Sequence, residues 1–226
     1  TPQALALALK QPIPIPINEK KTSQLVPIFD KARRELGADY LKSIVSDMKE
    51  LGYDIDDIDI RRPTHLVANA ILPGELVGVS FKENDLRCYV DQPSISQGMF
   101  RAFSLLAQVN YYVMSSKDVC ILADDVGEGL DFDRSCALID VLRRKVYESS
   151  ASTQLIMTTN DRFVMNRVPL EEWTVLQRKG HRVRVRNYEN SKAEFDEFKY
   201  TGLSNFDFLA TDFLDEESEV EAASRE

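Results

Sequence analysis

Four short groups of residues able to contact a ligand follow one another in the middle of the sequence. In chain order they are Ser96-Gln97-Gly98, Asp124-Asp125, Gly129-Leu130-Asp131 and Thr159-Asn160. They combine hydroxyl, amide and carboxylate groups with glycines, which leave the backbone accessible. What they can do depends on whether the fold brings them together.

The first group lies in "PSISQGMFRAF", between two polar strands and an apolar helix. Ser96 can cap a helix that begins near Gln97, and Gly98 lets a ligand approach free N–H groups at the positive end of the helix dipole. The stretch therefore suits an anion, with phosphate as the obvious candidate. An ordinary helix cap without a ligand is the alternative.

The elements around these groups predict an α/β fold. Residues 97–114 are apolar on nearly all sides, as in a helix buried between layers, and "DVCILADD" is an apolar strand that ends in two carboxylates. An amphipathic helix over residues 132–148 leads to a second apolar strand, "TQLIMTTND". This order predicts a right-handed parallel crossover, in which the carboxyl ends of both strands meet at the edge where α/β sheets bind ligands.

Flanking segments are expected to complete the domain. Residues 1–21 contain alternating prolines and predict an extended connector, and residues 23–51 predict one long helix or a helical hairpin, broken near Gly37. The antiparallel strands expected next are "DIDIRRP", "THLVANAIL", "ELVGVSFKE" and "DLRCYVD". The last predicted elements are a hairpin that turns near Gly180 and one or two short helices with Phe195, Phe198 and Leu203.

Composition argues against several classes of protein. The formal charge is −9, but the tail from Asp215 to Glu226 holds six acids and one Arg, a net −5, which leaves about −4 for the rest. Such a mildly acidic body gives no support for a protein that coats nucleic acid or anionic membranes. Three cysteines and two histidines without metal-ligand spacing predict a reduced, cytoplasmic protein with no zinc site, and no stretch is apolar enough for a membrane span.

In order and spacing, the motifs resemble those of ABC-type ATPases, in particular the SMC-like and Rad50-like AAA branch. "ISQGMFRAFSLL" is similar to the signature motif, which reads Leu/Ile-Ser-x-Gly-x-x-Arg before an apolar helix. "VCILADD" resembles Walker B, "EGLD" the D-loop, and "LIMTTND" the strand that leads to the switch residue. The resemblance covers residues 53–165 and implies the C-terminal lobe of a P-loop NTPase, with ATP and Mg²⁺ as cofactors.

The resemblance implies a role for the first two groups. It places Ser96, Gln97 and Gly98 at the γ-phosphate of an ATP bound to the opposing subunit, across a dimer. Asp124 would hold Mg²⁺ through water. Asp125 stands where the family usually has the glutamate that orients the attacking water; its side chain is one methylene shorter, so slow hydrolysis is expected. A solvated turn is the alternative for this acidic pair.

Two further residues have counterparts in the family. Asp131 matches the D-loop aspartate, which communicates across the dimer, and it also suits the N-cap of the following helix. Asn160 stands at the switch position, where many ABC proteins have histidine. Asparagine can hydrogen-bond a γ-phosphate but cannot carry charge or shuttle a proton.

One motif of the family is missing. No glycine is followed by Lys-Ser or Lys-Thr, so the sequence lacks GxxxxGK[ST], the Walker A loop that cradles the β- and γ-phosphates. In the family this loop lies near the N-terminus, so the chain, which begins at Thr1 rather than Met, resembles a C-terminal half with its Walker A half elsewhere. We expect a connector and helical insertion over residues 1–52, the ATPase lobe over 53–212 and a disordered acidic tail over 213–226.

The resemblance therefore implies an ATPase subunit or fragment that forms a homodimer or higher oligomer around ATP and switches an effector protein, in bacterial DNA processing or antiphage defence. Arg182, Arg184 and Arg186 alternate along one strand and form a basic stripe, which suits either nucleic acid or a solvated strand face. Two other functions stay open. One is a non-catalytic interaction module, in which Asp125 and Asn160 signal lost hydrolysis. The other is a magnesium-dependent Toprim-like nuclease, which would need an Asp-x-Asp pair and a separate glutamate.

Overall fold

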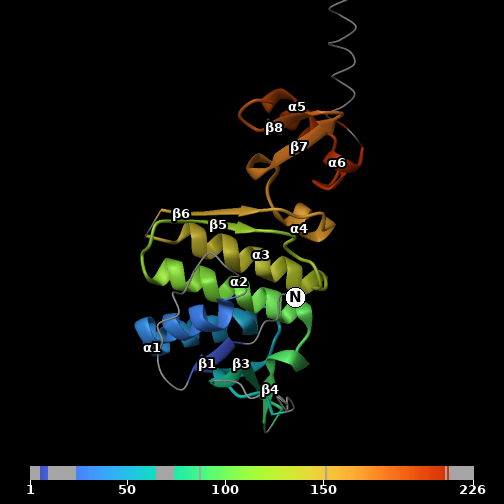
Figure 1. Cartoon of the computed structure of the whole chain (residues 1–226). Coiled ribbons are helices and arrows are strands. Elements are labelled where there is room, and N and C mark those ends of the chain that lie inside the picture. The colour runs from blue at the N-terminus through green and yellow to red at the C-terminus, as the bar shows by residue number, and fades with distance from the viewer. Residues whose placement is uncertain are drawn as a thin grey trace, which may run out of the picture. The chain divides into compact units, whose positions relative to one another are not determined.

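The computed structural model describes residues 6–9, 24–64, 74–86, 88–150, 152–211 and 213. The chain divides into two compact units, Thr1–Thr158 and Thr159–Glu226, both drawn in Figure 1. Three predicted features lie almost entirely outside the described residues: the proline-rich part of the connector, the strand "THLVANAIL" and the acidic tail.

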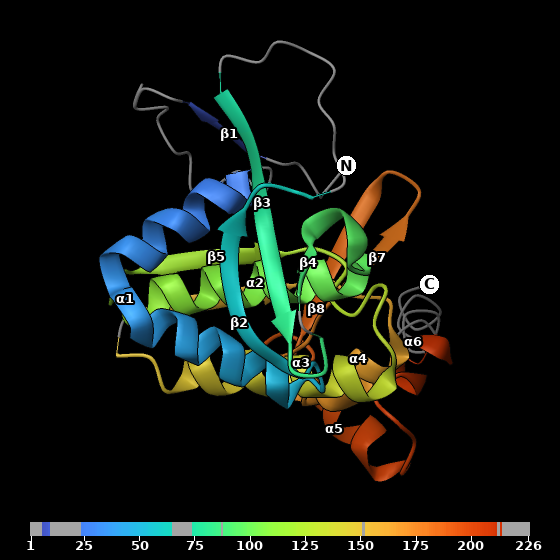
Figure 2. The same ribbon diagram turned by 90° about the horizontal axis from the view of Figure 1, so that it is seen from below.

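The first unit contains an antiparallel sheet. Its strands are β1 (Ala6–Leu9), β2 (Ile55–Arg61), β3 (Gly74–Glu83) and β4 (Tyr89–Asp91). The long strand β3 is central, because β1, β2 and β4 all pair with it (Figure 2). The strands predicted from "DIDIRRP", "ELVGVSFKE" and "DLRCYVD" are confirmed, whereas β1 was not predicted and lies inside the expected connector.

A kinked helix, α1 (Leu25–Glu50), packs on this sheet. The kink is at Gly37, where φ is 68° and ψ is −148°, a conformation that favours glycine. The predicted break is thus confirmed, and Figure 2 shows the two halves meeting at an angle. Phe29 of α1 and Phe81 of β3 both pack edge-on against Phe103, with ring centroids 5.4 and 5.0 Å away, so helix and sheet share one core.

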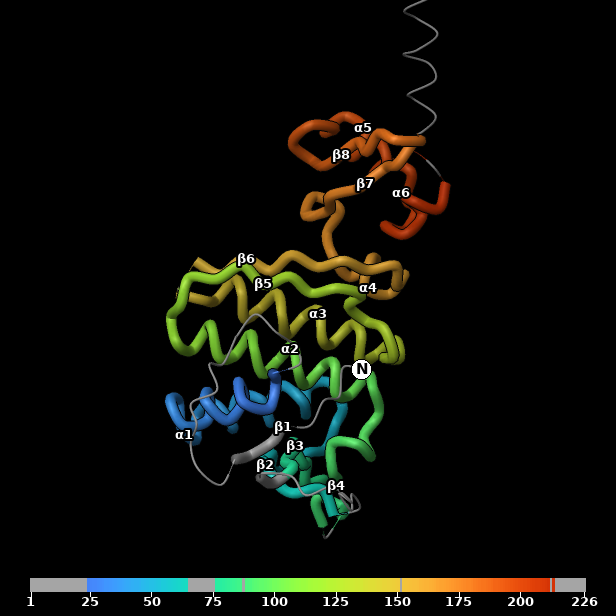
Figure 3. The backbone as a smooth tube through the Cα atoms, in the orientation of Figure 1, coloured from blue at the N-terminus to red at the C-terminus, as the bar shows by residue number. Residues whose placement is uncertain are grey.

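The parallel part of the unit follows the antiparallel sheet. Its elements are α2 (Gln97–Met114), β5 (Val119–Ala123), α3 (Phe132–Tyr147) and β6 (Thr153–Met157). β5 and β6 pair in parallel, which confirms the predicted strand–helix–strand crossover and the α/β class. α2 and α3 pack on this pair and α1 packs on α2, as the tube in Figure 3 traces. The predicted bounds of the buried helix, residues 97–114, are confirmed.

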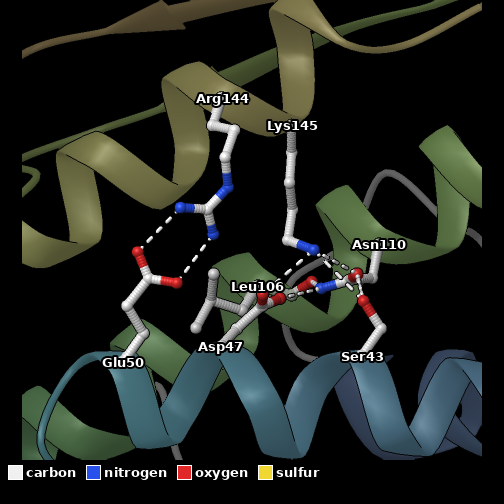
Figure 4. A network of polar contacts seen from close by, with 7 residues as sticks. All are labelled: Ser43, Asp47, Glu50, Leu106, Asn110, Arg144 and Lys145. Carbon is white, nitrogen blue, oxygen red and sulfur yellow. Dashed lines mark hydrogen bonds and ion pairs between the residues drawn. The ribbon is translucent and has the colours of Figure 1, made fainter.

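A buried polar network connects the three helices (Figure 4). Asp47 of α1 is 4% exposed; its carboxylate lies 3.0 Å from Nζ of Lys145 and accepts a 2.6 Å hydrogen bond from Nδ2 of Asn110. Lys145 also donates to Oδ1 of Asn110 and to Oγ of Ser43, at 2.9 and 3.1 Å. Both oxygens of Asp47 and the ammonium group are thus bonded, and the network fixes α1, α2 and α3 relative to one another.

The second unit is a hairpin with short helices. Its elements are α4 (Arg162–Arg167), the 3₁₀ turn η3 (Leu170–Glu172), β7 (Thr174–Lys179), β8 (Arg182–Asn187), α5 (Lys192–Tyr200) and α6 (Asp207–Ala210). Gly180 lies between β7 and β8, so the predicted turn is confirmed. Phe195 and Phe198 are buried as expected, but Leu203 is 52% exposed in the turn after α5, and Phe208 of α6 is buried instead. No helix among the described residues is long and apolar enough to cross a membrane.

Candidate functional site

The start of α2 is an N-cap of the predicted kind. A short 3₁₀ turn, η2 (Gln92–Ser94), precedes it, and the chain is then extended up to Ser96. The hydroxyl of Ser96 accepts a hydrogen bond of 3.1 Å from the backbone N–H of Met99. Ser96 and Gln97 are exposed, whereas Gly98 is buried. The accessible part of the helix start is therefore Ser96 and Gln97.

Gly98 is buried because it packs against the loop that follows β5. A Cβ atom added to Gly98 would lie 2.1 Å from the carbonyl oxygen of Gly129 and 3.1 Å from Cδ2 of Leu130. A Cβ atom on Gly129 would in turn lie 3.3 Å from the backbone nitrogen of Gly98. Glycine is thus required at position 98 by a contact between two backbones, a reason that the sequence reading, which considered ligand access, did not include.

A second contact joins the same two segments. The guanidinium group of Arg101, one helical turn after Gly98, forms an ion pair with the carboxylate of Glu128. Glu128 is the residue just before Gly129. The signature-like helix and the D-loop-like segment therefore meet at two neighbouring points.

The acidic pair lies at the end of β5, as predicted, and both side chains are exposed. Thr158, which follows β6, connects them: its hydroxyl donates to Oδ1 of Asp124 and accepts from the backbone N–H of Asp125 at 3.1 Å. Asp125 has a φ of 50°, the left-handed region that residues other than glycine rarely adopt. The exposed side chains fit both readings of the pair, and the backbone of Asp125 is held in one unusual conformation.

The loop between the acidic pair and α3 is held by its own backbone. The backbone N–H of Val126 donates a hydrogen bond of 2.9 Å to the carbonyl oxygen of Thr158. The N–H of Glu128 donates to the carbonyl oxygen of Asp125 at 3.2 Å, and that of Leu130 to the carbonyl oxygen of Gly127 at 3.0 Å. The loop is therefore a series of tight turns that links the end of β5 to the start of α3.

Asp131 ends this loop as the N-cap of α3. Its carboxylate accepts a 2.9 Å hydrogen bond from the backbone N–H of Arg134 and pairs with the guanidinium group of the same residue. The backbone hydrogen bond is the main reason that the pKa of Asp131 lies below its ordinary value. The guanidinium group also lies over the ring of Tyr53, 4.6 Å from its centroid. The capping role is thus confirmed, and the D-loop role stays a prediction.

Two predicted features belong to the second unit. Asn160 is exposed in the segment that precedes α4, and its switch role and its relation to the acidic pair stay predictions. In the basic stripe, Arg186 forms an ion pair of 3.0 Å with Glu194. The stripe therefore offers two exposed arginines, Arg182 and Arg184, rather than three.

Among the described residues, no group of three or more His, Cys, Asp or Glu side chains could hold a metal ion. Mg²⁺ needs less from a protein, because it keeps several waters and binds phosphate oxygens together with one or two carboxylates. Asp124 fits such a role: its carboxylate is exposed, and the Thr158 hydroxyl bonds to one of its two oxygens. The residues present are compatible with a metal ion that a nucleotide shares.

Sequence reasoning missed Thr158, and it included Glu128 only as part of the D-loop-like motif "EGLD", without a role of its own. Thr158 could have been found, because it directly follows Met157, which pairs with Ala123 in the parallel register, and so lies level with Asp124. The pairing of Glu128 with Arg101 carried no comparable signal, since Arg101 lies on a helix whose approach to the loop only the fold determines.

No protein-family model matches the chain, and no curated protein does. Solved structures do match. An Smc head domain with a coiled coil and joint from Pyrococcus yayanosii has a TM-score of 0.50 and 15% identity, covering 74% of this chain and 30% of that one. An SmcHead bound to the C-winged helix domain of ScpA has a TM-score of 0.50 and 13% identity, covering 75% and 51%.

At such identities the likeness concerns the fold alone. This chain spans only 30% and 51% of the two head structures. Its parallel pair packed against helices, with an N-terminal helix and an antiparallel sheet, is the α/β fold that it shares with SMC head domains.

Proposed function

We propose that this chain is the C-terminal half of an ABC-type, SMC-like ATPase, and that it binds ATP and Mg²⁺ at a composite interface as a dimerisation switch. The backbone contact between Gly98 and Gly129 carries the proposal. Through it, the anion-suited start of α2 lies beside the loop that joins the acidic pair to Asp131. In a dimer of this family the α2 start serves the ATP of the opposing subunit and the acidic pair serves the ATP of its own chain, so the contact joins the two kinds of group that the composite interface requires.

Each side chain then has a defined task. Asp124 holds Mg²⁺ through water, and the bound metal neutralises charge on the transferred phosphoryl group. Asp125 orients the attacking water. Ser96 uses its lone pair for the N–H of Met99, so its own proton is free to bond a γ-phosphate oxygen of the opposing subunit, next to Gln97. Asp131 and Asn160 serve as the D-loop and switch residues.

The proposed partner is a half that contains Walker A. The outer face of the parallel pair supports this idea, because Leu122 and Ile156, neighbours in the register of β5 and β6, are 75% and 46% exposed. Parallel sheets are usually covered on both faces. A further α/β half packed here would bury these side chains and bring its phosphate loop to the end of β5.

The proposed cellular role is that ATP-driven association of this chain controls an effector protein. One of the similar structures is an SmcHead bound to the C-winged helix domain of ScpA. By analogy, ATP-driven association of this chain would change its contact with an effector protein, in bacterial DNA processing or antiphage defence. Arg182 and Arg184 are the side chains proposed to contact DNA or RNA.

A non-catalytic interaction module is the second candidate, favoured by the short side chain of Asp125 in place of the family glutamate. A Toprim-like nuclease fits less well, because it needs further carboxylates beside the acidic pair. The described residues gather no such third ligand.

Two substitutions in the ATPase completed by its Walker A half test the proposal. Asp125→Asn should abolish turnover and leave ATP-induced dimers intact in sedimentation, whereas Asp124→Asn should lose Mg²⁺-dependent ATP binding. Equal damage to binding and turnover from both changes would contradict the assignment. Normal ATP-dependent dimers without any turnover in the wild-type enzyme would favour the interaction module. The isolated chain should bind ATP weakly, and micromolar affinity in titration calorimetry would contradict the missing-half argument.

A further inference from the structure

The start of α2 and the loop after β5 contact each other at two points on one side of each segment. On α2, Arg101 follows Gly98 by three residues, a spacing that puts both on the same helix face. On the loop, Glu128 directly precedes Gly129. We call the Gly98–Gly129 backbone contact and the Arg101–Glu128 ion pair together the clamp.

The loop side of the clamp leads directly to Asp125. The N–H of Glu128 donates to the carbonyl oxygen of Asp125 at 3.2 Å, while the N–H of Asp125 donates to Oγ1 of Thr158 at 3.1 Å. A residue other than glycine stays at a φ of 50° only where its surroundings determine it. Glu128 and Thr158 are the two neighbours that hold the Asp125 backbone from opposite sides.

The Arg101–Glu128 ion pair contributes too little to the stability of the fold for stability to be its main role. The side chains of Arg101 and Glu128 are 38% and 62% exposed, and pairs this exposed contribute little to folding. The pair nevertheless lies next to the Gly98–Gly129 backbone contact, where an ion pair opposes movement of the loop along α2.

We propose that Arg101 and Glu128 are positioning residues for Asp125, and that the clamp transmits a displacement of the α2 start to the acidic pair. The consequence for turnover rests on the proposed ATPase function, whereas the coupling itself does not. An anion held by Ser96 and Gln97 would restrain the α2 start, and through the clamp it would also restrain the loop that carries the Asp125 backbone.

Amide hydrogen exchange of the full chain without nucleotide tests the coupling. The reporters are the N–H groups of Glu128 and Leu130, both hydrogen-bonded inside the loop; where residue 128 is itself replaced, Leu130 alone is the reporter, because the new side chain changes the intrinsic exchange of residue 128. Arg101→Glu and Glu128→Arg should each speed their exchange by about three- to tenfold, because like charges then face each other, and the double variant with the pair reversed should restore it.

A matched ion pair away from the loop serves as the control. Arg144 and Glu50 join α3 to α1, and their side chains are 43% and 40% exposed. Arg144→Glu should leave the exchange of Glu128 and Leu130 unchanged. The proposed coupling through the clamp is wrong if the control variant speeds exchange as much as Arg101→Glu does. It is also wrong if the reversed pair fails to restore slow exchange.

The completed ATPase gives a second readout, separate from folding. Arg101→Glu should lower kcat by about tenfold with an unchanged KM for ATP, and the reversed pair should recover most of it, as expected of groups that orient a catalytic side chain. An equal change in KM, or no rescue, would contradict a positioning role. A wild-type enzyme without turnover but with the expected exchange pattern would contradict the proposed function and leave the clamp standing.

Discussion

Two groups of carboxylates in the first unit differ in burial and in how many of their oxygens are hydrogen-bonded. Asp47, between the helices, is almost fully buried, and both of its oxygens are bonded, to Lys145 and Asn110. Asp124 and Asp125, at the end of β5, are exposed, and Thr158 fixes the backbone of one and a single oxygen of the other.

The difference separates charges that hold the fold from charges available for chemistry. A buried charge must keep its partners, since leaving it unpaired is strongly unfavourable. An exposed carboxylate on a fixed backbone costs little and leaves its oxygens to water, metal or substrate. Substitutions in the network should therefore affect stability, and those at the strand end should affect function.

Removal of the buried cation should have the largest effect. Lys145→Met leaves Asp47 without its ammonium partner and should lower the free energy of unfolding by about 3–5 kcal/mol in urea denaturation. Lys42→Met is the control: this side chain is 77% exposed and pairs with Asp39, so a change below about 0.5 kcal/mol is expected. Similar losses in the two variants would contradict the contrast between buried and exposed charge.

The same variant should respond to pH. Burial is the largest cause that raises the pKa of Asp47 above its ordinary 3.8, and Asn110 and Lys145 oppose it. A group whose pKa is raised by folding supports the folded state at low pH and loses that contribution as pH rises through the folded value. Since Lys145→Met removes an opposing cation, its stability deficit should shrink as pH falls from neutral towards the ordinary range of aspartate. A deficit that stays constant would exclude Asp47 as its source.

The clamp contact should have the next largest effect. Alanine usually stabilises a helix relative to glycine by about 1 kcal/mol, but a Cβ at position 98 would overlap the carbonyl of Gly129. Gly98→Ala should therefore lower the free energy of unfolding by about 1–3 kcal/mol. Stabilisation by this change in chemical denaturation would show that the loop yields easily, and that the two segments are not coupled through their backbones.

The N-cap of α2 should have a smaller effect on stability and a larger one on association. Ser96→Ala removes the acceptor of the Met99 N–H and should cost about 1 kcal/mol. Ser94→Ala, at the exposed end of η2, is the control. In the completed ATPase, Ser96→Ala should also weaken ATP-dependent dimers in sedimentation. Loss of stability with normal dimers would mean that Ser96 is a helix cap only.

The contrast between the two regions also shows what sequence patterns reveal. Continuous apolar runs predicted α2 and the parallel pair, and the amphipathic pattern predicted α3. The positions of Asp124 and Asp131 followed from the same elements. The Gly98–Gly129 contact could not be predicted, since a close approach of two backbones depends on how a loop folds back on a helix. Phe208 in place of Leu203 is a similar case, since Phe208 is buried in one cluster with Phe195 and Phe198, a tertiary contact that the local pattern does not show.

The smallest expected change in stability gives the sharpest test of the strand end. Two non-glycine residues have a positive φ among the described residues: Asp125 at 50° and Ser116, in the turn after α2, at 49°. Glycine relieves the steric cost of this conformation, so Asp125→Gly and Ser116→Gly should each shift the free energy of unfolding by no more than about 1 kcal/mol, in the stabilising direction. Turnover of the completed ATPase should be lost only in Asp125→Gly. If Asp125→Gly instead lowers stability well beyond Ser116→Gly, the Asp125 side chain holds the fold as Asp47 does, and the distinction between the two regions does not apply to it.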